Sequence, residues 1–120
     1  MLSSAPASIA HHAFTAEYDS TKPMEVTGTV TKVEWMNPHA RFYVDVKDAG
    51  VVTNWNFELG SPILLRRLGW RSDSLKIGDQ VTVQGYLAKD GSKMANAKSV
   101  KLADGRNVFA GSSLDGSPTR

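Results

Sequence analysis

The sequence contains no cysteine. This absence excludes disulfide bonds, thiolate zinc sites, iron–sulfur clusters and a cysteine nucleophile. Long apolar runs are missing too: no stretch approaches the about 20 residues that a membrane-spanning helix needs, so we expect no membrane span. A large excess of one charge is also absent: the chain has 14 basic and 12 acidic residues, which give a formal net charge of +2. A charge this small neither requires nor excludes a polyanionic partner.

The remaining composition is that of an ordinary globular domain. Of the 120 residues, 41% are hydrophobic and 22% are charged, which places the chain well away from disordered proteins. The length suffices for one hydrophobic core, but not for a core and a separate catalytic domain. We therefore expect one small folded unit.

Residues 1–10 carry no charge and are mostly small, like the end of a secretory signal peptide just before its cleavage site. Ser8 and Ala10 supply small side chains at positions −3 and −1 of a cut before His11. We interpret this segment as a signal-peptide remnant, which predicts an exported, periplasmic protein that begins at His11. The alternative is a flexible tail without a targeting role. Residues 11–23 then form an N-terminal segment ahead of the folded domain.

Three strands are predicted in the first half of that domain. The segment 24–35 is rich in Val and Thr, and its apolar alternation slips once after Gly28, which predicts a long first strand with a bulge. The segment 41–47 alternates cleanly, with its even-numbered apolar residues facing inward and Arg41 and Tyr43 facing outward. A turn then leads into a third strand over residues 51–59.

A short helix and two further strands complete the pattern. Ser61 followed by Pro62 is typical of a helix start, and Gly69 with Trp70 is typical of a helix end in which Trp70 packs back over Leu65. Strands are predicted over residues 81–87 and 94–102, the second with a bulge near Lys98.

This order of elements predicts a mainly β fold: a small five-stranded Greek-key barrel of the OB type over residues 24–110, with one short helix between the third and fourth strands. The alternative is another small antiparallel barrel or sandwich. Residues 111–120 are polar and rich in glycine, so we expect a flexible tail there.

Histidine provides the candidate metal ligands. A free N-terminal histidine binds Cu(II) through its amine and ring nitrogen, and a further imidazole completes a nitrogen-rich tetragonal site. Cleavage before His11 would create such a terminus, with His12 or His39 supplying the further imidazole. We therefore predict a copper site formed by His11, His12 and His39; the alternative is that these histidines are incidental.

The loop before the second strand adds candidate ligand-binding residues. Met36 could pair its thioether with His39 on Cu(I), and Asn37 lies in the same loop. Alternatively, the loop is a plain turn in which His39 hydrogen-bonds a backbone carbonyl. Arg41 and Tyr43 extend the candidate set onto the outer face of the second and third strands, where OB-folds bind nucleic acid or oligosaccharide.

Nucleic acid is nevertheless not expected as a partner, because Asp45 and Glu58 are predicted on the same face and aromatic residues make up only 8% of the chain. No nucleophile elbow, zinc-protease motif, P-loop or dinucleotide fingerprint is present. Glu34 and Glu58 could approach each other across strands, but we expect both as exposed, solubilising carboxylates. The chain is therefore predicted not to be an enzyme.

Several motifs occur together between residues 11 and 106. They are His11-His12-Ala-Phe14, Gly28-Thr-Val-Thr-Lys-Val-Glu-Trp35, Asn37-Pro-His39, Trp55-Asn-Phe-Glu58, Ser61-Pro62, Gly69-Trp70 and Leu75-Lys-Ile-Gly-Asp79. This combination resembles a bacterial family of small exported domains of unknown function. The resemblance implies an exported OB-like barrel and supplies no catalytic residue. Its matched polar positions, which are His11, His12, Asn37 and His39, are where we expect a ligand.

The leading hypothesis is thus a non-enzymatic periplasmic OB-fold module that binds a small ligand or a transition-metal ion, with copper as its cofactor. The first alternative is an envelope interaction domain that binds a protein, peptide or glycan on the outer face of its second and third strands. The second is single-stranded nucleic-acid binding, which requires that residues 1–10 are not a signal remnant. The identity of a protein partner stays open.

Overall fold

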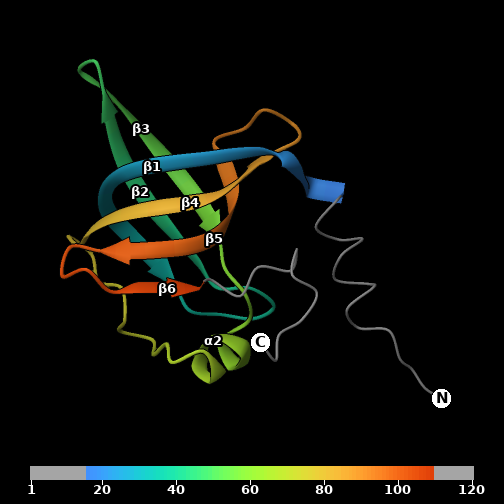
Figure 1. The fold of residues 1–120 in the computed structure, drawn as a ribbon, viewed down its shortest axis with the longest axis vertical. Coiled ribbons are helices and arrows are strands. Elements are labelled where there is room, and N and C mark those ends of the chain that lie inside the picture. The colour runs from blue at the N-terminus through green and yellow to red at the C-terminus, as the bar shows by residue number, and fades with distance from the viewer. Residues whose placement is uncertain (1–15, 110–120) are drawn as a thin grey trace.

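Six strands and the short helix α2 make up the part of the chain that the computed structural model describes, residues 16–109 (Figure 1). In chain order they are β1 (Tyr18–Glu34), β2 (Arg41–Asp48), β3 (Val51–Glu58), α2 (Pro62–Arg67), β4 (Gln80–Ala88), β5 (Met94–Leu102) and β6 (Asn107–Phe109). No helix among these residues is long and apolar enough to cross a membrane.

The sheet runs in the order β3-β2-β1-β4-β5-β6 and closes on itself because β3 also pairs with β5. The closing pair is parallel and joins residues 56–58 to residues 94–96, whereas the other strand pairs are antiparallel. Five strands closed in this way, with a helix between β3 and β4, form an OB-fold. The predicted barrel is confirmed, and β6 adds a short strand on the free edge of β5 that the prediction did not include.

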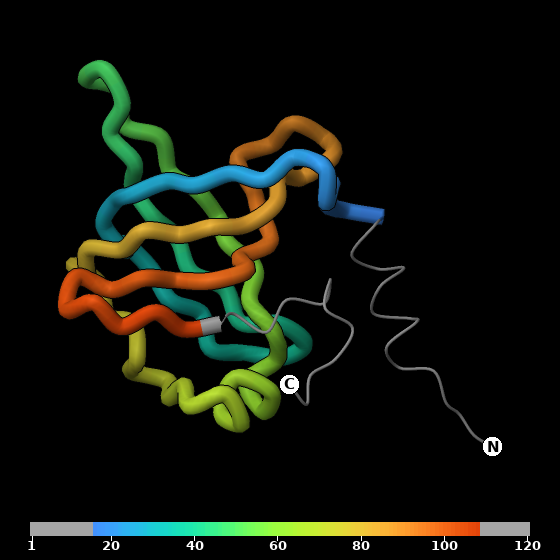
Figure 2. Tube along the Cα trace, in the orientation of Figure 1, coloured from blue at the N-terminus to red at the C-terminus, as the bar shows by residue number. Residues whose placement is uncertain are grey.

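β1 pairs with β4 along its first part and with β2 along its last part, and it bends between the two (Figure 2). The register against β2 shifts between Val30 and Lys32, so Thr31 is the extra residue of the predicted bulge. At Gly28, an added Cβ atom would collide with the backbone oxygen of Asp45. Glycine at this position therefore lets β2 come close enough to pair with the bent strand.

β1 begins at Tyr18, whereas the predicted strand begins at residue 24. Residues 18–22 are Tyr-Asp-Ser-Thr-Lys, which shows no apolar alternation. Their partner is β4: Tyr18 lies opposite Ala88, and the backbone N–H of Lys89 donates to the carbonyl oxygen of Glu17 at 2.8 Å. Pairing with a distant strand, rather than local preference, extends β1 into the segment expected to precede the barrel.

The second predicted bulge lies in β5. The register between β4 and β5 shifts after the pair Gln84–Ser99, and the next pair is Gly85–Ala97. Lys98 is therefore the extra residue. Beside it lies a shallow hollow of about 380 Å³, lined in part by Pro23, Tyr86 and Lys98.

α2 is defined by its two ends. The backbone N–H of Leu64 donates to the Ser61 hydroxyl at 3.3 Å, which caps the first turn. At the other end Gly69 has φ +100°, and the N–H of Trp70 donates to the carbonyl of Leu65 at 2.9 Å, as in a Schellman motif. Leu65 and Trp70 are both buried, and α2 lies across the lower end of the barrel in Figure 1.

The inward side chains of the five closing strands fill the barrel. Phe42 and Phe57 stack with their ring centroids 5.2 Å apart. The other buried members of the core cluster are Val30, Ala40, Val44, Leu59, Leu65, Trp70, Leu75, Val81, Val83, Ala95, Ala97, Val100 and Leu102. This core holds β2, β3 and β5 in register, and the candidate site lies where these strands meet.

Candidate ligand site around Glu58

Glu58, the last residue of β3, is the one buried carboxylate among residues 16–109, with only 6% of its surface exposed. The prediction of an exposed, solubilising carboxylate is wrong at this position. Glu58 does lie on the outer face of β3, but it pairs with Arg41 on β2 and with Asn96 on β5. Neighbours on both sides therefore cover it, and a buried carboxylate needs compensating partners.

Two buried polar side chains surround one part of the Glu58 carboxylate. The Asn96 side-chain amide donates to Oε1 at 3.5 Å, and Asn96 itself is 2% exposed. Tyr18 is also buried, and its phenol interacts with the same carboxylate. Burial and, after it, the Glu58 charge raise the pKa of Tyr18 above its ordinary value, so the phenol keeps its proton even at alkaline pH.

Two basic side chains approach the other oxygen, Oε2. The Nη2 atom of Arg41 lies 3.6 Å from Oε2, and the Nε2 atom of His39 lies 3.7 Å from it. Both distances exceed the 2.7–2.9 Å of a direct charge-assisted hydrogen bond. Oε2 thus faces two nitrogen-bearing groups without a short contact to either.

The orientation of the His39 ring follows from its second nitrogen. Nδ1 lies 3.2 Å from the carbonyl oxygen of Leu59, and a carbonyl can only accept, so Nδ1 carries the hydrogen in this contact. In the neutral ring, Nε2 then presents a lone pair toward Oε2. A lone pair and a carboxylate oxygen repel unless a cation, either a proton or a metal ion, lies between them.

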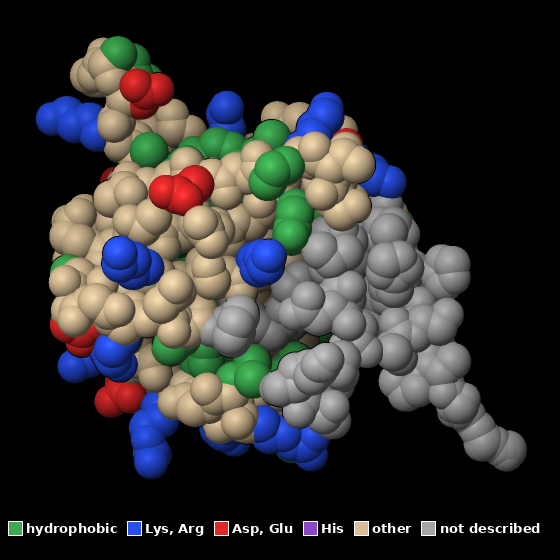
Figure 3. Space-filling model, viewed as in Figure 1, with side chains coloured by type: hydrophobic (Ala, Val, Ile, Leu, Met, Phe, Trp, Pro, Cys, Tyr) green, Lys and Arg blue, Asp and Glu red, His purple; other side chains and the backbone are tan. Residues whose placement is uncertain are grey.

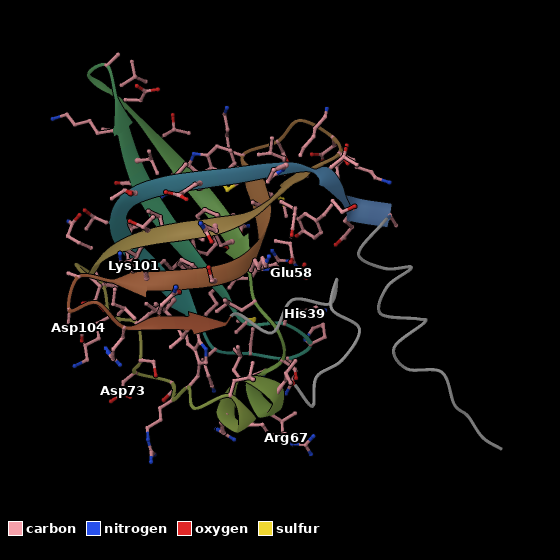
Figure 4. The ribbon with its side chains drawn as sticks, in the orientation of Figure 1. His39, Glu58, Arg67, Asp73, Lys101 and Asp104 are labelled. Atoms are coloured by element: carbon pink, nitrogen blue, oxygen red, sulfur yellow. The ribbon has the colours of Figure 1, made fainter. Side chains whose placement is uncertain are left out.

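His39 and Arg41 are the two predicted site residues that the structure brings to Glu58, and Figure 4 shows His39 and Glu58 on the same side of the barrel. Met36 and Asn37, in the same loop as His39, are exposed. His11 and His12 lie outside the described residues. Within residues 16–109, no three His, Asp or Glu side chains form a cluster that could hold a metal ion.

Tyr43, the remaining predicted ligand-binding residue, belongs to a separate cluster on the outer face of β1 and β2. Its hydroxyl donates to Glu34 Oε1 at 3.1 Å, and the Lys32 ammonium lies 5.3 Å from its ring centroid and 3.1 Å from Glu34 Oε2. The Lys32 contact and, to a lesser extent, the Tyr43 hydroxyl lower the pKa of Glu34. Each of these polar groups already has a partner within the cluster.

Asn54 and Asp45, which lie on the same outer face, are also hydrogen-bonded to each other. Asn54 on β3 donates to Asp45 on β2 at 2.8 Å and to Thr31 at 3.2 Å. On the face shown in Figure 3, which carries β4 and β5, basic and acidic side chains are scattered and form no continuous basic stripe. Among the described residues of this one face, the basic side chains therefore form no run like that of a nucleic-acid groove.

No single residue could have predicted the Glu58 site from sequence. The motif Trp55-Asn-Phe-Glu58 carried the only signal, because its alternation places Glu58 outside the barrel next to Arg41. Asn96 and Tyr18 join from β5 and β1, 38 and 40 positions away along the chain. The approach of Asn96 depends on the pairing of β3 with β5, and that of Tyr18 depends on the course of β1, and local sequence encodes neither.

The closed sheet of five strands places the described part of the chain in the class of small OB-fold proteins. More particularly, the chain belongs to DUF6152, a family of unknown function, whose model matches residues 1–97. A search of curated proteins found no match.

Among solved structures, the chain is similar to two crystal forms of Rim1, the mitochondrial single-stranded DNA binding protein of S. cerevisiae. Form 2 shares 16% identity with a TM-score of 0.54, and the match covers 71% of this chain and 97% of that one. Form 1 shares 13% identity with a TM-score of 0.54, covering 68% and 92%. At such identities the likeness establishes the fold alone.

Proposed function

We propose that this protein is a non-enzymatic, exported module of the bacterial periplasm that binds a transition-metal ion, copper in particular, at the His39–Glu58 pair, with His11 and His12 as further ligands. The observation that supports this function is the pairing of His39 Nε2 with Glu58 Oε2 at 3.7 Å. A metal ion between the two atoms would form one coordinate bond with each of them.

The pair has dimensions suited to a shared ion. Two donors that each lie about 2.0–2.2 Å from one metal ion are about 3 Å apart from each other, so the 3.7 Å gap needs to close by less than 1 Å. The His39 Nδ1 contact with the Leu59 carbonyl supplies the outer hydrogen bond that commonly orients a metal-ligating imidazole.

The N-terminal histidines can reach this pair. Tyr18 interacts with Glu58, so the chain enters the barrel next to the site. His12 lies six positions before Tyr18 in the sequence, and an extended chain of that length spans at most about 20 Å. Imidazole and amine nitrogens with one carboxylate oxygen form a tetragonal donor set, which favours Cu(II) over purely oxygen-bound ions.

The direct test is titration of the form that begins at His11 with Cu(II), monitored by calorimetry and electron paramagnetic resonance. We expect one equivalent to bind, with nitrogen couplings that decrease in number in His39→Ala and an affinity that falls about 10- to 100-fold. Lys32→Gln is the matched control, because Lys32 lies on the outer face but contacts Glu34. Affinity and couplings unchanged in His39→Ala would contradict the proposal.

The export half of the proposal has its own test. Mass spectrometry of the protein recovered from cells should give a first residue of His11 if residues 1–10 are removed as a signal remnant. A protein that retains residues 1–10 has no free amine at His11, and it should bind Cu(II) more weakly than the processed form. Equal affinity of both forms would exclude the amine as a ligand.

A further inference from the structure

The hairpin of β2 and β3 extends beyond the rest of the barrel (Figure 2), and part of β3 there has a neighbour on one side only. β3 pairs with β2 along its whole length, from residue 51 to residue 58. Its pairing with β5 covers only residues 56–58. Among the strands formed by residues 16–109, none pairs with the outer edge of β3 over residues 51–55.

The turn of the hairpin determines which backbone groups point out of this edge. Ala49 and Gly50 have φ values of 53° and 82°, as in a two-residue type I′ turn. Asp48 and Val51 flank the turn and lie opposite each other, so they form the first hydrogen-bonded pair of the hairpin.

Hydrogen-bonded pairs alternate along an antiparallel ladder, so the odd-numbered residues of β3 direct their N–H and C=O groups toward β2. The even-numbered residues direct theirs outward. Asn56 agrees with this alternation, because its N–H donates outward to the carbonyl of Lys93 at 3.0 Å. The N–H and C=O groups of Val52 and Asn54 therefore point out of the open edge.

No charged residue protects this edge. Residues 51–55 are Val-Val-Thr-Asn-Trp, and Val51 and Val52 are 64% and 56% exposed. Proteins commonly protect an open strand edge with charged side chains, proline or a bulge. β-branched and aromatic residues instead favour strand pairing. This segment is thus suited to accept a further strand.

We propose that the open edge of β3 pairs antiparallel with the same edge of a second copy of this chain, about a two-fold axis at Thr53. With Thr53 opposite its own counterpart, Val52 lies opposite Asn54 of the second copy, and these two residues exchange N–H···O bonds. The axis repeats this pair. All the outward N–H and C=O groups of Val52 and Asn54 are then bonded. This inference is independent of the proposed function.

The side chains favour the same register. Val51 lies opposite Trp55 of the second copy, in a non-hydrogen-bonded pair, where facing side chains are closest. Val51 is exposed and Trp55 is half-buried in the single chain, so both can lose apolar surface to water on pairing. Contacts between an aromatic and a β-branched residue across strands are favourable, and the axis provides this contact twice.

The length of the open edge and its charges indicate a second copy rather than another strand. The paired strand turns away at Gly50, opposite Asn56, which is where β5 begins to occupy the edge. The Lys93 ammonium lies at this end, 5.3 Å from the centroid of the Trp55 ring. Asp48 of the second copy comes to the same sheet face as Lys93, because Asp48 lies opposite Val51. These charges are opposite in sign and therefore complementary.

Thr53→Cys tests the position of the axis, since the chain has no other cysteine. Facing Cα atoms in a non-hydrogen-bonded pair are about 4.5 Å apart, within the range of a disulfide. Val46→Cys is the matched control, because Val46 lies opposite Thr53 on β2 and is also half-buried. In the dimer, residue 46 lies three strand spacings, about 14 Å, from its counterpart.

In a glutathione redox buffer, the full-length Thr53→Cys chain should form a disulfide-linked dimer at least about 10-fold faster than Val46→Cys. Equal rates of dimer formation in the two variants would overturn the proposed register.

Sedimentation equilibrium tests the pairing without a covalent bond. The interface is small, so the wild-type mass should rise gradually from one chain toward two as the concentration increases. Thr53→Lys and Thr53→Glu each place like charges opposite each other at the axis, so each variant alone should stay monomeric. A mixture of the two should regain the dimer, because the charges are then opposite.

A wild-type chain that stays monomeric at every concentration would overturn the proposal and leave the edge to a different partner. A dimer that persists in Thr53→Lys and Thr53→Glu would also overturn it, as would a mixture of the variants that fails to associate while the wild type does. Thermal unfolding of each variant, compared with wild type, shows that it is folded.

Discussion

Two polar clusters share the outer face of this barrel, and they differ in how completely their groups are paired. The Glu34 cluster, formed by Lys32, Glu34 and Tyr43, has contacts of 3.1 Å from each donor to the carboxylate. The Glu58 site has a buried carboxylate whose contacts with Asn96, Arg41 and His39 measure 3.5–3.7 Å, and which also interacts with the Tyr18 phenol.

The difference indicates at which of the two carboxylates a bound cation would gain more free energy. A carboxylate that is partly exposed and already bonded at short distance, such as Glu34, gains little from a further cation because water and its partners satisfy it. A carboxylate removed from water and held by long contacts gains much more from a cation at close range. Similar residue types on one sheet face therefore differ in the free energy that a bound cation would gain, because their burial and their contact distances differ.

The largest expected effect is on metal affinity. Glu58→Gln keeps the shape and an acceptor oxygen for Asn96 but removes the charge, so we expect Cu(II) affinity to fall about 100-fold. Glu34→Gln should change the Cu(II) affinity less than about 3-fold, because that carboxylate lies in the other cluster and is partly exposed to screening solvent. Calorimetric titration of both variants measures the contrast, and equal losses would remove the distinction between the clusters.

Next in size is an effect on stability. Tyr18→Phe removes the phenol that interacts with the buried Glu58 carboxylate, and we expect a loss of about 1–3 kcal/mol in the free energy of unfolding. Tyr43→Phe removes a hydroxyl from the part-exposed Glu34 cluster and should cost about 0.5 kcal/mol or less. Urea denaturation of both variants tests this order, and the reverse order would contradict the burial argument.

The pH dependence of stability should report the buried Tyr18 phenol. The folded state raises the pKa of Tyr18 above its ordinary value, so above about pH 10 the unfolded chain binds fewer protons than the folded one. Stability is then fully present below pH 10 and is lost as the pH rises further. Thermal melts should show that Tyr18→Phe flattens this alkaline loss, and an unchanged slope in that variant would contradict the assignment of the loss to Tyr18.

The smallest effect is expected within the neighbouring exposed pair. Asn54→Ala removes the hydrogen bonds to Asp45 and Thr31, and because water can replace them, we expect a change within about 0.5 kcal/mol and no change in metal affinity. Chemical denaturation and Cu(II) titration of this variant provide the baseline for the larger effects. A drop in metal affinity would show that the outer face acts as one connected network.

Much of the fold could be predicted because the relevant signals are local. Ser61 and Gly69 define the two ends of α2 through hydrogen bonds and a positive φ that depend on adjacent residues. The alternation around Thr31 and Lys98 slips within a few residues, so both bulges could be located. β6 was missed because three residues show no period, and the early start of β1 was missed because its cause is the pairing with β4.

The candidate site could be predicted only in part. His39 was found because histidine is rare in this chain, at 3 of 120 residues, and Arg41 because its strand alternates clearly. Glu58 was misassigned to solvent, since alternation places it outside the barrel but says nothing about what covers that side. Tyr18 and Asn96 were not predicted as site residues because nothing near them in the sequence marks them.

The alternation of apolar and polar residues, the turns and the helix ends follow from the sequence, since each depends on residues only a few positions apart. The burial of Glu58, in contrast, depends on the tertiary structure. That outcome depends on the pairing of β3 with β5, which brings Asn96 next to Glu58, and on the course of β1, which brings Tyr18 to it. A side chain is buried only when residues from other strands cover it, and these residues come together only in the closed barrel.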